Sequence, residues 1–476
     1  MNQHTILERF EALVRSQAES RALGRVQRSQ TQWWSWDRCA SAVEDELRDL
    51  HTVEKLAEGA FVSGHDVTGV EWFARHLASW RMAGVTVGES FGGWGRPRPD
   101  QLASLVTTAG TSGEPRGVML THENLASNAV ALSEASGGDG DELRLSFLPM
   151  EHLYARTCDL YTWIVRGSRL VLAESPKTVF RDARLVKPTV INGVPYFFQK
   201  AIDLADAEGV SLKHLLGGEI RRLYCGGAPL SPRVEERFAD EGIPIYTGYG
   251  LTEASPVVTV NTPTAYKPGT VGRPLPGVEV RIAQNDTDTP GEVLVRGPNV
   301  MLGYWDDAEA TAEVLRDGWL HTGDLGRLDD EGFLTITGRA KELIALATAK
   351  KVAPSRVEAM LCASPWIEQA CVFGEGRKGL TALIVPSRER LGAEVRRRRL
   401  WVWSKRGALR HSQVRAIYRE VIDECLASAA LEERVHDFRL IGRGFDQARG
   451  EMTAKLSLRR TEIERSFERE LTEMNG

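Results

Sequence analysis

The chain has 476 residues, of which 42% are hydrophobic and 26% are charged, and its formal net charge is −5. Such a composition excludes disorder over most of the chain, supplies material for large cores and predicts two or three domains. The acidic balance argues against a protein whose main task is to coat nucleic acid, so no nucleic-acid partner is expected.

The cysteines and the N-terminus both indicate a cytoplasmic protein. The six cysteines lie apart, without Cys-x-x-Cys pairs or histidines at ligand spacing, so reduced and mostly buried thiols are expected in place of disulfides or a zinc site. Residues 1–25 carry charges throughout, and no window approaches about 18 uncharged apolar residues. The closest expected approach to a membrane is therefore peripheral contact at its inner face. The cysteines are Cys39, Cys158, Cys225, Cys362, Cys371 and Cys425.

The first 95 residues have the pattern of helices with one or two strands, and they end in the Gly- and Pro-rich segment 91–99. A loop rich in glycine and hydroxyl side chains follows at 107–118, after an apolar stretch at 102–106 that predicts an entering strand. Glycines let backbone amides approach an anion, while the hydroxyls and the cation Arg116 add further donors. The loop therefore predicts phosphate binding, with an ordinary turn as the alternative.

The same loop excludes two common nucleotide motifs. It lacks the Gly-Lys-Ser/Thr ending of the P-loop and the Gly-x-Gly-x-x-Gly of dinucleotide folds. We interpret it as a mobile phosphate loop of another class.

Between residues 100 and 260, short apolar runs alternate with helical patterns, which predicts an α/β layered domain with a largely parallel sheet. The predicted strands are 145–148, 169–173, 189–192, 222–225 and 243–247. Between 270 and 340, short strands and turns such as 277–282 and 291–296 predict a β-rich subdomain.

After residue 338 a new unit begins, which is long enough for a small separate α+β domain with a highly charged helical tail. Its predicted elements are a helix at 355–363 and strands at 369–373 and 380–385. The basic cluster 396–399, with Lys405 and Arg406, is expected to be a solvated helix face. Contact with acidic lipid or with phosphate groups is the alternative.

Three turns in the second half of the chain combine glycine with an acidic side chain, at residues 246–253, 318–326 and 338–344, and the first two also contain threonine. A bound nucleotide needs an aromatic face for its base, a carboxylate for its ribose hydroxyls, a second carboxylate for Mg²⁺ and a cation for phosphate. The turns supply all of these, although each turn taken singly could be purely structural.

In this order, the loop and the turns resemble the AMP-forming acyl-CoA synthetases of the adenylate-forming superfamily, and within it the long-chain fatty acyl-CoA synthetases. The likeness runs from about residue 100 to 460. It includes Leu-Pro-Met-Glu-His at 148–152, Gly-Gly-Ala-Pro-Leu at 226–230 and a segment at 374–386 that is typical of the fatty-acid branch.

The resemblance implies an α/β adenylate-forming fold. Its large N-terminal domain would span residues 1–338, with a β-rich subdomain at about 270–338 and an abbreviated region at 1–95, and a small mobile α+β C-terminal domain would span 339–476. The implied enzyme is a ligase that forms a carbon–sulfur bond in two steps. A fatty acid and MgATP first give an acyl-adenylate and pyrophosphate, and coenzyme A then takes the acyl group and releases AMP. The implied partners are thus fatty acid, ATP, Mg²⁺ and coenzyme A, and the oligomeric state stays open.

The resemblance also implies roles for single residues. Glu253 would hold Mg²⁺, Thr252 would contact the α-phosphate and Tyr249 would stack on adenine. His152 would lie near the acyl carboxylate, with a hydrogen-bonded core histidine as the alternative. The β- and γ-phosphates would be cradled by Thr107, Thr108, Gly110, Thr111, Ser112, Gly113 and Arg116. The remaining contacts would come from Gly227 and Ala228 at the base edge, Asp324 and Arg339 at the ribose, and Lys341 at the hinge between the domains.

The chain departs from the family pattern in its loop and near its end. Ala109 and Arg116 stand where serine and lysine are usual, and neither change excludes ATP binding. The segment 450–460 resembles Gly-Glu-Leu-Thr-Pro-Thr-Leu-Lys-Leu-Arg-Arg, whose lysine bridges the substrate carboxylate and phosphate. Aligned without a gap, that position is Ser457, while Lys455 stands two residues earlier, about 6–7 Å away in an extended segment. We take Lys455 as the catalytic lysine, acting with reduced efficiency.

Only 106 residues precede the loop, so the N-terminal sheet is expected to be smaller than the family norm. Fatty acyl-CoA ligation is the first hypothesis. One alternative is an enzyme that hands its acyl-adenylate to a carrier protein, and the other is a catalytically impaired relative that binds nucleotide or acyl ligands. Pyrophosphate release distinguishes these hypotheses, because both enzymes release it and the impaired relative does not.

Overall fold

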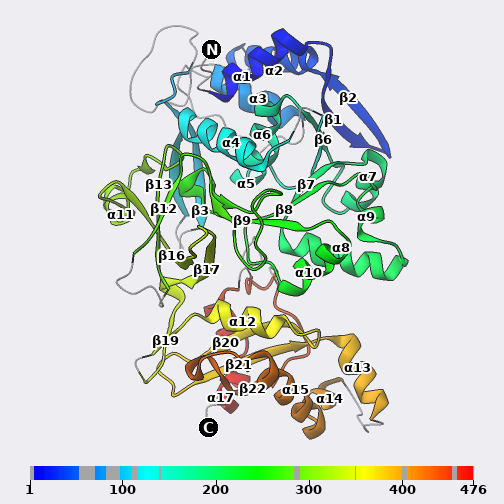
Figure 1. Ribbon diagram of the computed structural model, residues 1–476, viewed down its shortest axis with the longest axis vertical. Helices are drawn as coiled ribbons and strands as arrows, with labels where there is room; N and C mark the ends of the chain where they lie inside the picture. Colours follow the sequence, from blue (N-terminus) through cyan, green and yellow to red (C-terminus); the bar gives the residue numbers. More distant parts are fainter. Residues whose placement is uncertain are drawn as a thin grey trace.

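The computed structural model shows an α/β protein whose long axis runs from the N-terminal helices to a smaller C-terminal unit (Figure 1). The β-rich region lies beside the central sheet, and the C-terminus lies at the far end of the smaller unit. The structure describes residues 5–52, 70–81, 97–109, 115–138, 141–283, 290–348, 350–398, 405–446, 448–452 and 458–474.

A nine-stranded sheet forms the centre of the large unit, in the order β11-β10-β9-β8-β7-β5-β6-β1-β2. Six adjacent strands pair in parallel, in the order β9, β8, β7, β5, β6 and β1, which confirms the predicted parallel sheet. Antiparallel strands lie at both edges, with β2 beside β1 and with β10 and β11 beyond β9. Their bounds are β1 Arg21–Gln27, β2 Gln30–Ser35, β5 Leu143–Ser146, β6 Arg169–Leu172, β7 Val190–Gly193, β8 Arg222–Cys225, β9 Ile245–Gly250, β10 Val257–Val260 and β11 Arg273–Pro274.

Helices cover both faces of this sheet, which explains why its inner strands are continuous apolar runs. One core contains Phe198 of α8 and Phe238 of α10, and the other contains Trp36 at the start of α2 and Trp163 of α6. The helices are α1 Ile6–Gln17, α2 Trp36–Thr52, α3 Val70–Arg81, α4 His122–Ser136, α5 Leu153–Ala155, α6 Thr162–Arg166, α7 Val179–Val186, α8 Pro195–Glu208, α9 Leu212–Leu215 and α10 Pro232–Asp240, with a π-helical turn at Arg156–Tyr161.

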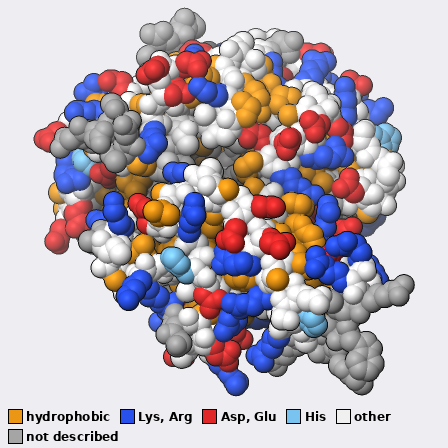
Figure 2. Space-filling model, turned by 60° about the horizontal axis from the view of Figure 1, so that its bottom comes forward, with side chains coloured by type: hydrophobic (Ala, Val, Ile, Leu, Met, Phe, Trp, Pro, Cys, Tyr) orange, Lys and Arg blue, Asp and Glu red, His pale blue; other side chains and the backbone are white. Residues whose placement is uncertain are grey.

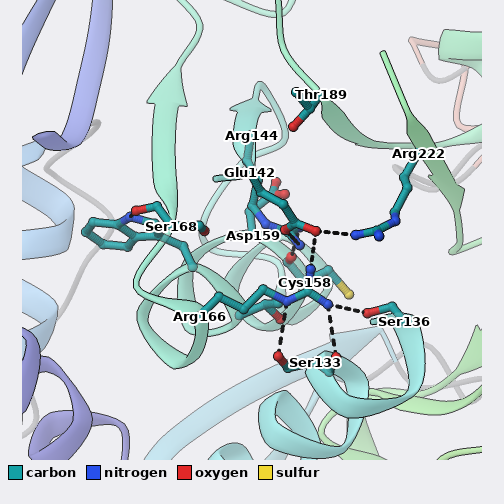
Figure 3. Close-up of polar contacts among 12 residues, drawn as sticks. Ser133, Ser136, Glu142, Arg144, Cys158, Asp159, Arg166, Ser168, Thr189 and Arg222 are labelled. Carbon is teal, nitrogen blue, oxygen red and sulfur yellow. Dashed lines mark hydrogen bonds and ion pairs between the residues drawn. The ribbon is translucent and has the colours of Figure 1, made fainter. Parts of the chain in front are cut away.

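A buried charge cluster lies at the amino end of the parallel strands (Figure 3). The Glu142 carboxylate, just before β5, accepts a 2.9 Å hydrogen bond from Arg144 and further hydrogen bonds from Arg166 and Arg222. Arg166 also donates to the Ser136 hydroxyl at 2.6 Å, so the cluster ties the end of α4 to the sheet. Ligands of parallel sheets bind beyond the carboxyl ends of the strands, so this cluster has a structural role.

A β-rich region follows the large sheet in the chain, as predicted. Its five-stranded antiparallel sheet has the order β12-β13-β16-β15, with β17 paired to β16. A second sheet joins the hairpin β3-β4 to β14. The elements are β3 Leu102–Ala109, β4 Pro115–Thr121, β12 Glu279–Ala283, β13 Gly291–Arg296, β14 Gly303–Tyr304, α11 Ala308–Val314, β15 Leu315–Arg316, β16 Trp319–Leu328 and β17 Leu334–Arg339.

The C-terminal unit has its own hydrophobic clusters, formed by residues between 344 and 474. The expected helical tail contains five helices among its described residues, but the expectation missed one strand, because β22 within the tail pairs in parallel with β21. The sequence of β22 does not predict a strand, because it includes the polar residues His436, Asp437 and Arg439. The strand forms through its pairing with β21. The domain boundary at residue 338 stays a prediction. The elements are β18 Ile344–Ala345, β19 Lys351–Val352, α12 Pro354–Cys362, β20 Ile367–Phe373, β21 Leu380–Pro386, α13 Arg388–Arg397, α14 Lys405–Arg410, α15 Ser412–Cys425, β22 Val435–Leu440, α16 Arg460–Ser466 and α17 Glu468–Met474.

The state of the cysteines and the distribution of surface charge match what the composition predicts. All six cysteines are free thiols, four of them buried, and burial raises the pKa of Cys39 to about 12. On the face drawn in Figure 2, basic and acidic side chains are interspersed, without the broad basic field of a nucleic-acid surface. Among the described helices, none is both long and apolar enough to cross a membrane.

Candidate functional site

The hairpin β3-β4 carries the Gly/Ser/Thr-rich loop at its tip. Thr107 pairs with Gly117 and Thr108 with Arg116 across the two strands, so both threonines and the arginine flank the loop. Thr107 is exposed and Thr108 is half-buried. Four predicted phosphate-binding residues lie outside the described residues, and their roles stay predictions. They are Gly110, Thr111, Ser112 and Gly113.

Tyr304 of β14 lies between the predicted phosphate cation and the predicted metal ligand. The Arg116 guanidinium carbon is 5.3 Å from the centre of the Tyr304 ring, and the Tyr304 hydroxyl donates a 3.0 Å hydrogen bond to the Glu253 carboxylate. Burial and the Glu253 charge raise the pKa of Tyr304, so its phenol stays protonated. Arg116 also lies 3.4 Å from Asp307. The structure thus brings Arg116 and Glu253 to the same aromatic ring.

Sequence reasoning missed Tyr304. A signal was present in Gly303-Tyr304-Trp305, an aromatic pair after a glycine in a region of turns. Gly303 has φ 148°, and a Cβ there would lie 2.7 Å from the Thr311 side chain. Only a residue without a Cβ fits beside α11 at this point, and the turn then presents Tyr304 to Glu253.

Glu253 stands in a 3₁₀ turn, Thr252–Ala254, one residue after the end of β9. Its backbone carbonyl accepts a 2.9 Å hydrogen bond from Met301, and the Ala254 carbonyl accepts one of 2.9 Å from the Asn299 side chain. The chain then folds back so closely that a Cβ on Gly250 would lie 1.9 Å from the Pro256 carbonyl oxygen. These contacts hold Thr252 and Glu253 at the carboxyl end of a central strand, where ligands of parallel sheets bind.

Tyr249, Asp324 and Arg339 are in direct contact. The Tyr249 hydroxyl donates to Asp324 at 2.6 Å, and the Arg339 Nε donates to the other carboxylate oxygen at 2.6 Å. Asp324 is 6% exposed, and its backbone amide donates to the Thr322 hydroxyl at 3.1 Å. Burial and the nearby Asp324 charge raise the pKa of Tyr249 well above its usual value. A carboxylate accepts about four hydrogen bonds, so Asp324 retains capacity for two ribose hydroxyls.

The Gly227–Ala228 turn follows β8 and lies next to the ends of β7 and β9 in the sheet order. Gly227 is exposed with φ 85°, and Ala228 is half-buried. At the preceding Gly226, a Cβ would lie 3.0 Å from the Tyr154 ring, whose hydroxyl donates to the Gly193 carbonyl at 3.3 Å. The backbone of this turn is therefore open on one side and packed on the other.

His152 is exposed at the start of α5, so the alternative of a core histidine was wrong. Arg156 supports this segment, since its guanidinium donates to the carbonyls of Met150 and Glu151 and, at 2.8 Å, to Ser104 of β3. The segment that carries His152 is thereby fastened to the hairpin of the phosphate loop.

Two predicted residues belong to the C-terminal side. Lys341 is exposed in the 3₁₀ turn Ala340–Glu342, immediately after β17. Lys455 lies outside the described residues, as does Ser457. The hinge and catalytic roles stay predictions.

The Glu253 carboxylate suits a metal ion that binds together with a nucleotide. The described part of the chain contains no group of three or more His, Cys, Asp or Glu side chains that could hold a metal ion by itself. Mg²⁺ in nucleotide sites typically takes one or two carboxylates, with phosphates and water as the other ligands. A single carboxylate at Glu253, on the same Tyr304 side chain as Arg116, fits this mode.

Two family models match the chain. The model described as AMP-binding enzyme matches residues 47–305, and the model described as AMP-binding enzyme C-terminal domain matches residues 341–475.

Curated relatives are named as CoA ligases or as a CoA synthase. The long-chain-fatty-acid–CoA ligase FadD15 of Mycobacterium tuberculosis is 31% identical over 418 residues, which cover 78% of this chain and 68% of the relative. A long-chain-fatty-acid–CoA ligase of Escherichia coli O157:H7 is 34% identical over 291 residues, 58% of this chain and 50% of the relative. A feruloyl-CoA synthase of an Amycolatopsis species is 34% identical over 330 residues, 66% of each chain.

Solved structures share the fold. The anthranilate CoA ligase AuaEII in complex with anthranoyl-AMP superposes with a TM-score of 0.77 at 16% identity over 97% of each chain. ATP-bound MatB from Rhodopseudomonas palustris superposes with a TM-score of 0.76 at 21% identity, over 98% of this chain and 99% of that one. These likenesses confirm the predicted fold.

Proposed function

The chain belongs to the AMP-binding enzyme family, and we propose that it activates a fatty acid with ATP and ligates it to coenzyme A. The observation that carries this proposal is a set of three hydrogen bonds, Tyr249–Asp324, Arg339–Asp324 and Tyr304–Glu253, among the groups that we propose for base, ribose and metal. The names of the relatives FadD15 and the Escherichia coli ligase support a long-chain fatty acid as the substrate.

In the first step, a carboxylate oxygen of the fatty acid attacks the α-phosphorus of ATP, and the bond from that phosphorus to pyrophosphate breaks. The obstacle is repulsion between an anionic nucleophile and an anionic phosphate, so positive groups that meet the developing charge lower the barrier. Arg116 and the backbone amides of the loop would hold the β- and γ-phosphates, and Thr252 would hold the α-phosphate. When bound, Mg²⁺ would neutralise phosphate charge from its place at Glu253.

The nucleoside would lie across the carboxyl ends of β8 and β9. Tyr249 would offer its ring to adenine, while Gly227 and Ala228 would line the edge of the base. Asp324 would accept from the ribose hydroxyls, held in place by Tyr249 and Arg339. Because these hydrogen bonds hold the Asp324 carboxylate in place before the ligand binds, less conformational entropy is lost on binding.

In the second step, the sulfur of coenzyme A attacks the acyl carbon, AMP leaves with the bonding electrons and the thiol proton passes to solvent. Lys455 would supply positive charge in the first step only. Movement of the C-terminal unit about Lys341 would replace the groups of the first step by those of the second.

A pyrophosphate-release screen across fatty acids of increasing length, with and without coenzyme A, tests the proposal. Release that depends on a fatty acid, with acyl-CoA formed when coenzyme A is present, supports it. Release with no acyl-CoA favours transfer to a carrier protein. A shift in melting temperature with ATP but no release with any acid favours a binding protein without turnover. Ferulate serves as the aromatic comparison, because one relative is a feruloyl-CoA synthase. Peripheral contact with a membrane stays a prediction.

A further inference from the structure

Arg156 is a buried cation that donates hydrogen bonds only to neutral groups. It begins the π-helical turn after α5 and is 7% exposed. Its Nε donates to the Met150 carbonyl at 3.2 Å, one Nη to the Glu151 carbonyl at 3.1 Å and the other Nη to the Ser104 hydroxyl at 2.8 Å. Among the residues that the structure describes, no carboxylate pairs with it. A buried charge is costly to the fold unless an opposite charge balances it, and here the chain itself supplies none.

The other groups around Arg156 add no negative charge. Its guanidinium carbon lies 5.5 Å from the centre of the Trp72 ring. Burial raises the pKa of Tyr161 to about 12, so this phenol stays protonated although the Arg156 charge acts in the opposite direction. Burial, and then the Arg156 charge, lower the pKa of His76 well below its usual value, so this ring is neutral. Asp159, the acid of the same turn, is hydrogen-bonded to side chains of β5 and β7 instead.

Arg156 lies between the two segments that we propose for the anionic ligands. Ser104 belongs to β3, three residues before Thr107 at the base of the phosphate loop. On the other side, the Arg156 amide donates to the His152 carbonyl at 3.1 Å, so His152 lies one helical turn away. Charges attract one another more strongly in a protein than in bulk water. An anion that binds at either segment can therefore supply the counter-charge that the chain lacks.

We propose that Arg156 is a specificity-determining residue that selects the ionised form of the acid substrate. Because it is buried, it acts through its charge and not by contact. That charge attracts the carboxylate bound near His152 and has no comparable effect on an uncharged molecule of the same length. Two of the three side-chain hydrogen bonds of Arg156 go to the segment before His152, so the acid responds more than the loop-bound phosphates. The inference rests on the proposed function, in which the acid binds beside His152.

Substitutions at two positions separate the charge from the hydrogen bonds. Arg156→Lys keeps the charge and loses the planar fork, whereas Arg156→Gln keeps an amide donor and loses the charge. Ser104→Asp leaves Arg156 in place but sets a carboxylate where the guanidinium already donates at 2.8 Å, so it balances the charge. Ser104→Asn is its neutral counterpart. Should Arg156→Gln fail to fold, the two variants of Ser104 carry the same test.

The full chain is assayed with a fatty acid and with the primary alcohol of the same chain length. The acid concentration for half-maximal ATP–pyrophosphate exchange reports binding of the anion, and inhibition of that exchange by the alcohol reports binding of the uncharged chain. Arg415→Gln is the matched control. Arg415 also donates to a carbonyl, that of Phe438 at 3.1 Å, and lies 4.9 Å from the centre of the Phe438 ring, but its charge is paired with Asp437.

We expect the half-saturating acid concentration to rise on the order of tenfold in Arg156→Gln and in Ser104→Asp, which is roughly the effect of a unit charge about 10 Å away at an effective dielectric constant of about 20. Inhibition by the alcohol should stay within about threefold of wild type. For Arg156→Lys, Ser104→Asn and Arg415→Gln, acid and alcohol should both stay within about threefold.

Equal losses for acid and alcohol, or equal losses in Arg156→Gln and Arg156→Lys, would show a merely structural role and overturn the inference. Unchanged acid binding in Arg156→Gln and Ser104→Asp would overturn it as well. If the alcohol binds too weakly to measure, Gln against Lys and Asp against Asn still decide. These outcomes leave the proposed function intact, whereas a wild-type chain without exchange for any fatty acid would overturn the proposed function and this inference with it.

Discussion

The Tyr249 hydroxyl and the Asp324 carboxylate are 2.6 Å apart, although 75 positions separate them in the sequence. Tyr249 stands in β9 of the large sheet and Asp324 in β16 of the β-rich region. The bond therefore joins two sheets at the point where a base and a ribose would lie, and each residue orients the other.

Replacement of Tyr249 by Phe should weaken ATP binding about tenfold, since a hydrogen bond to a charged group contributes about 1.5–3 kcal/mol and Arg339 still holds Asp324. The measurement is the Kd for ATP by calorimetry. Tyr266→Phe removes a comparable 3.2 Å bond to Glu235 and should leave the Kd unchanged. Equal affinities for wild type and Tyr249→Phe would show that the bond does not orient the nucleotide.

Replacement of Glu253 by Gln should lower adenylation on the order of 10²-fold and raise the Mg²⁺ concentration needed for half-maximal rate, because a neutral amide binds the ion less well. Tyr304→Phe should have a smaller effect in the same direction, since Glu253 keeps its charge and loses only the 3.0 Å hydrogen bond that orients its carboxylate. Initial rates across a Mg²⁺ series at fixed ATP measure both. An unchanged Mg²⁺ dependence in Glu253→Gln would refute the metal assignment.

Replacement of Glu142 by Gln should destabilise the large unit by about 3–5 kcal/mol, because it leaves three arginines around a neutral group in a buried site. Urea unfolding followed by tryptophan fluorescence measures the loss. As a surface comparison, Glu331→Gln removes an exposed pair with Lys267 and should cost less than about 1 kcal/mol. The ATP affinity of the folded Glu142→Gln protein should match wild type, because the cluster lies at the opposite end of the strands from the site.

Asp159 should make stability depend on pH between about 4 and 6. Burial raises the pKa of its carboxyl to about 6, partly offset by hydrogen bonds from Ser146 and Asn192. Between the unfolded and folded pKa values the native state binds more protons, so the free energy of unfolding falls as pH rises, by about 2–3 kcal/mol in all. Unfolding of wild type and Asp159→Asn at several pH values isolates this contribution, and parallel curves for the two proteins would contradict it.

Local pattern predicted much of the fold. Strands β8 and β13 begin and end where the predicted strands 222–225 and 291–296 do, because both segments are short and bounded by turns. Strand β22 could not be predicted in this way, since its polar residues gain order only by pairing with β21. Periodicity carries no information about such a partner.

For the candidate site, too, the sequence predicts single residues better than it predicts their contacts. Motif order predicted nucleotide contacts for Tyr249, Asp324 and Arg339, and these roles stay predictions. Their hydrogen bonds to one another could not be predicted, because they depend on how two sheets pack. Tyr304 was missed because its importance comes from a neighbour 51 positions away rather than from its own surroundings in the sequence. The choice between Lys455 and Ser457 stays a prediction.

Fatty-acid-dependent ATP–pyrophosphate exchange by the wild-type chain, compared with Lys455→Ala and Ser457→Lys, tests both the proposed adenylation and the assignment of its lysine. We expect exchange in the wild type, a loss on the order of 10²–10³-fold in Lys455→Ala, and a gain in Ser457→Lys, whose charge stands at the usual family position. A wild-type protein that binds ATP yet shows no exchange with any fatty acid would contradict the proposed activity. A wild-type rate in Lys455→Ala would contradict the assignment of the lysine.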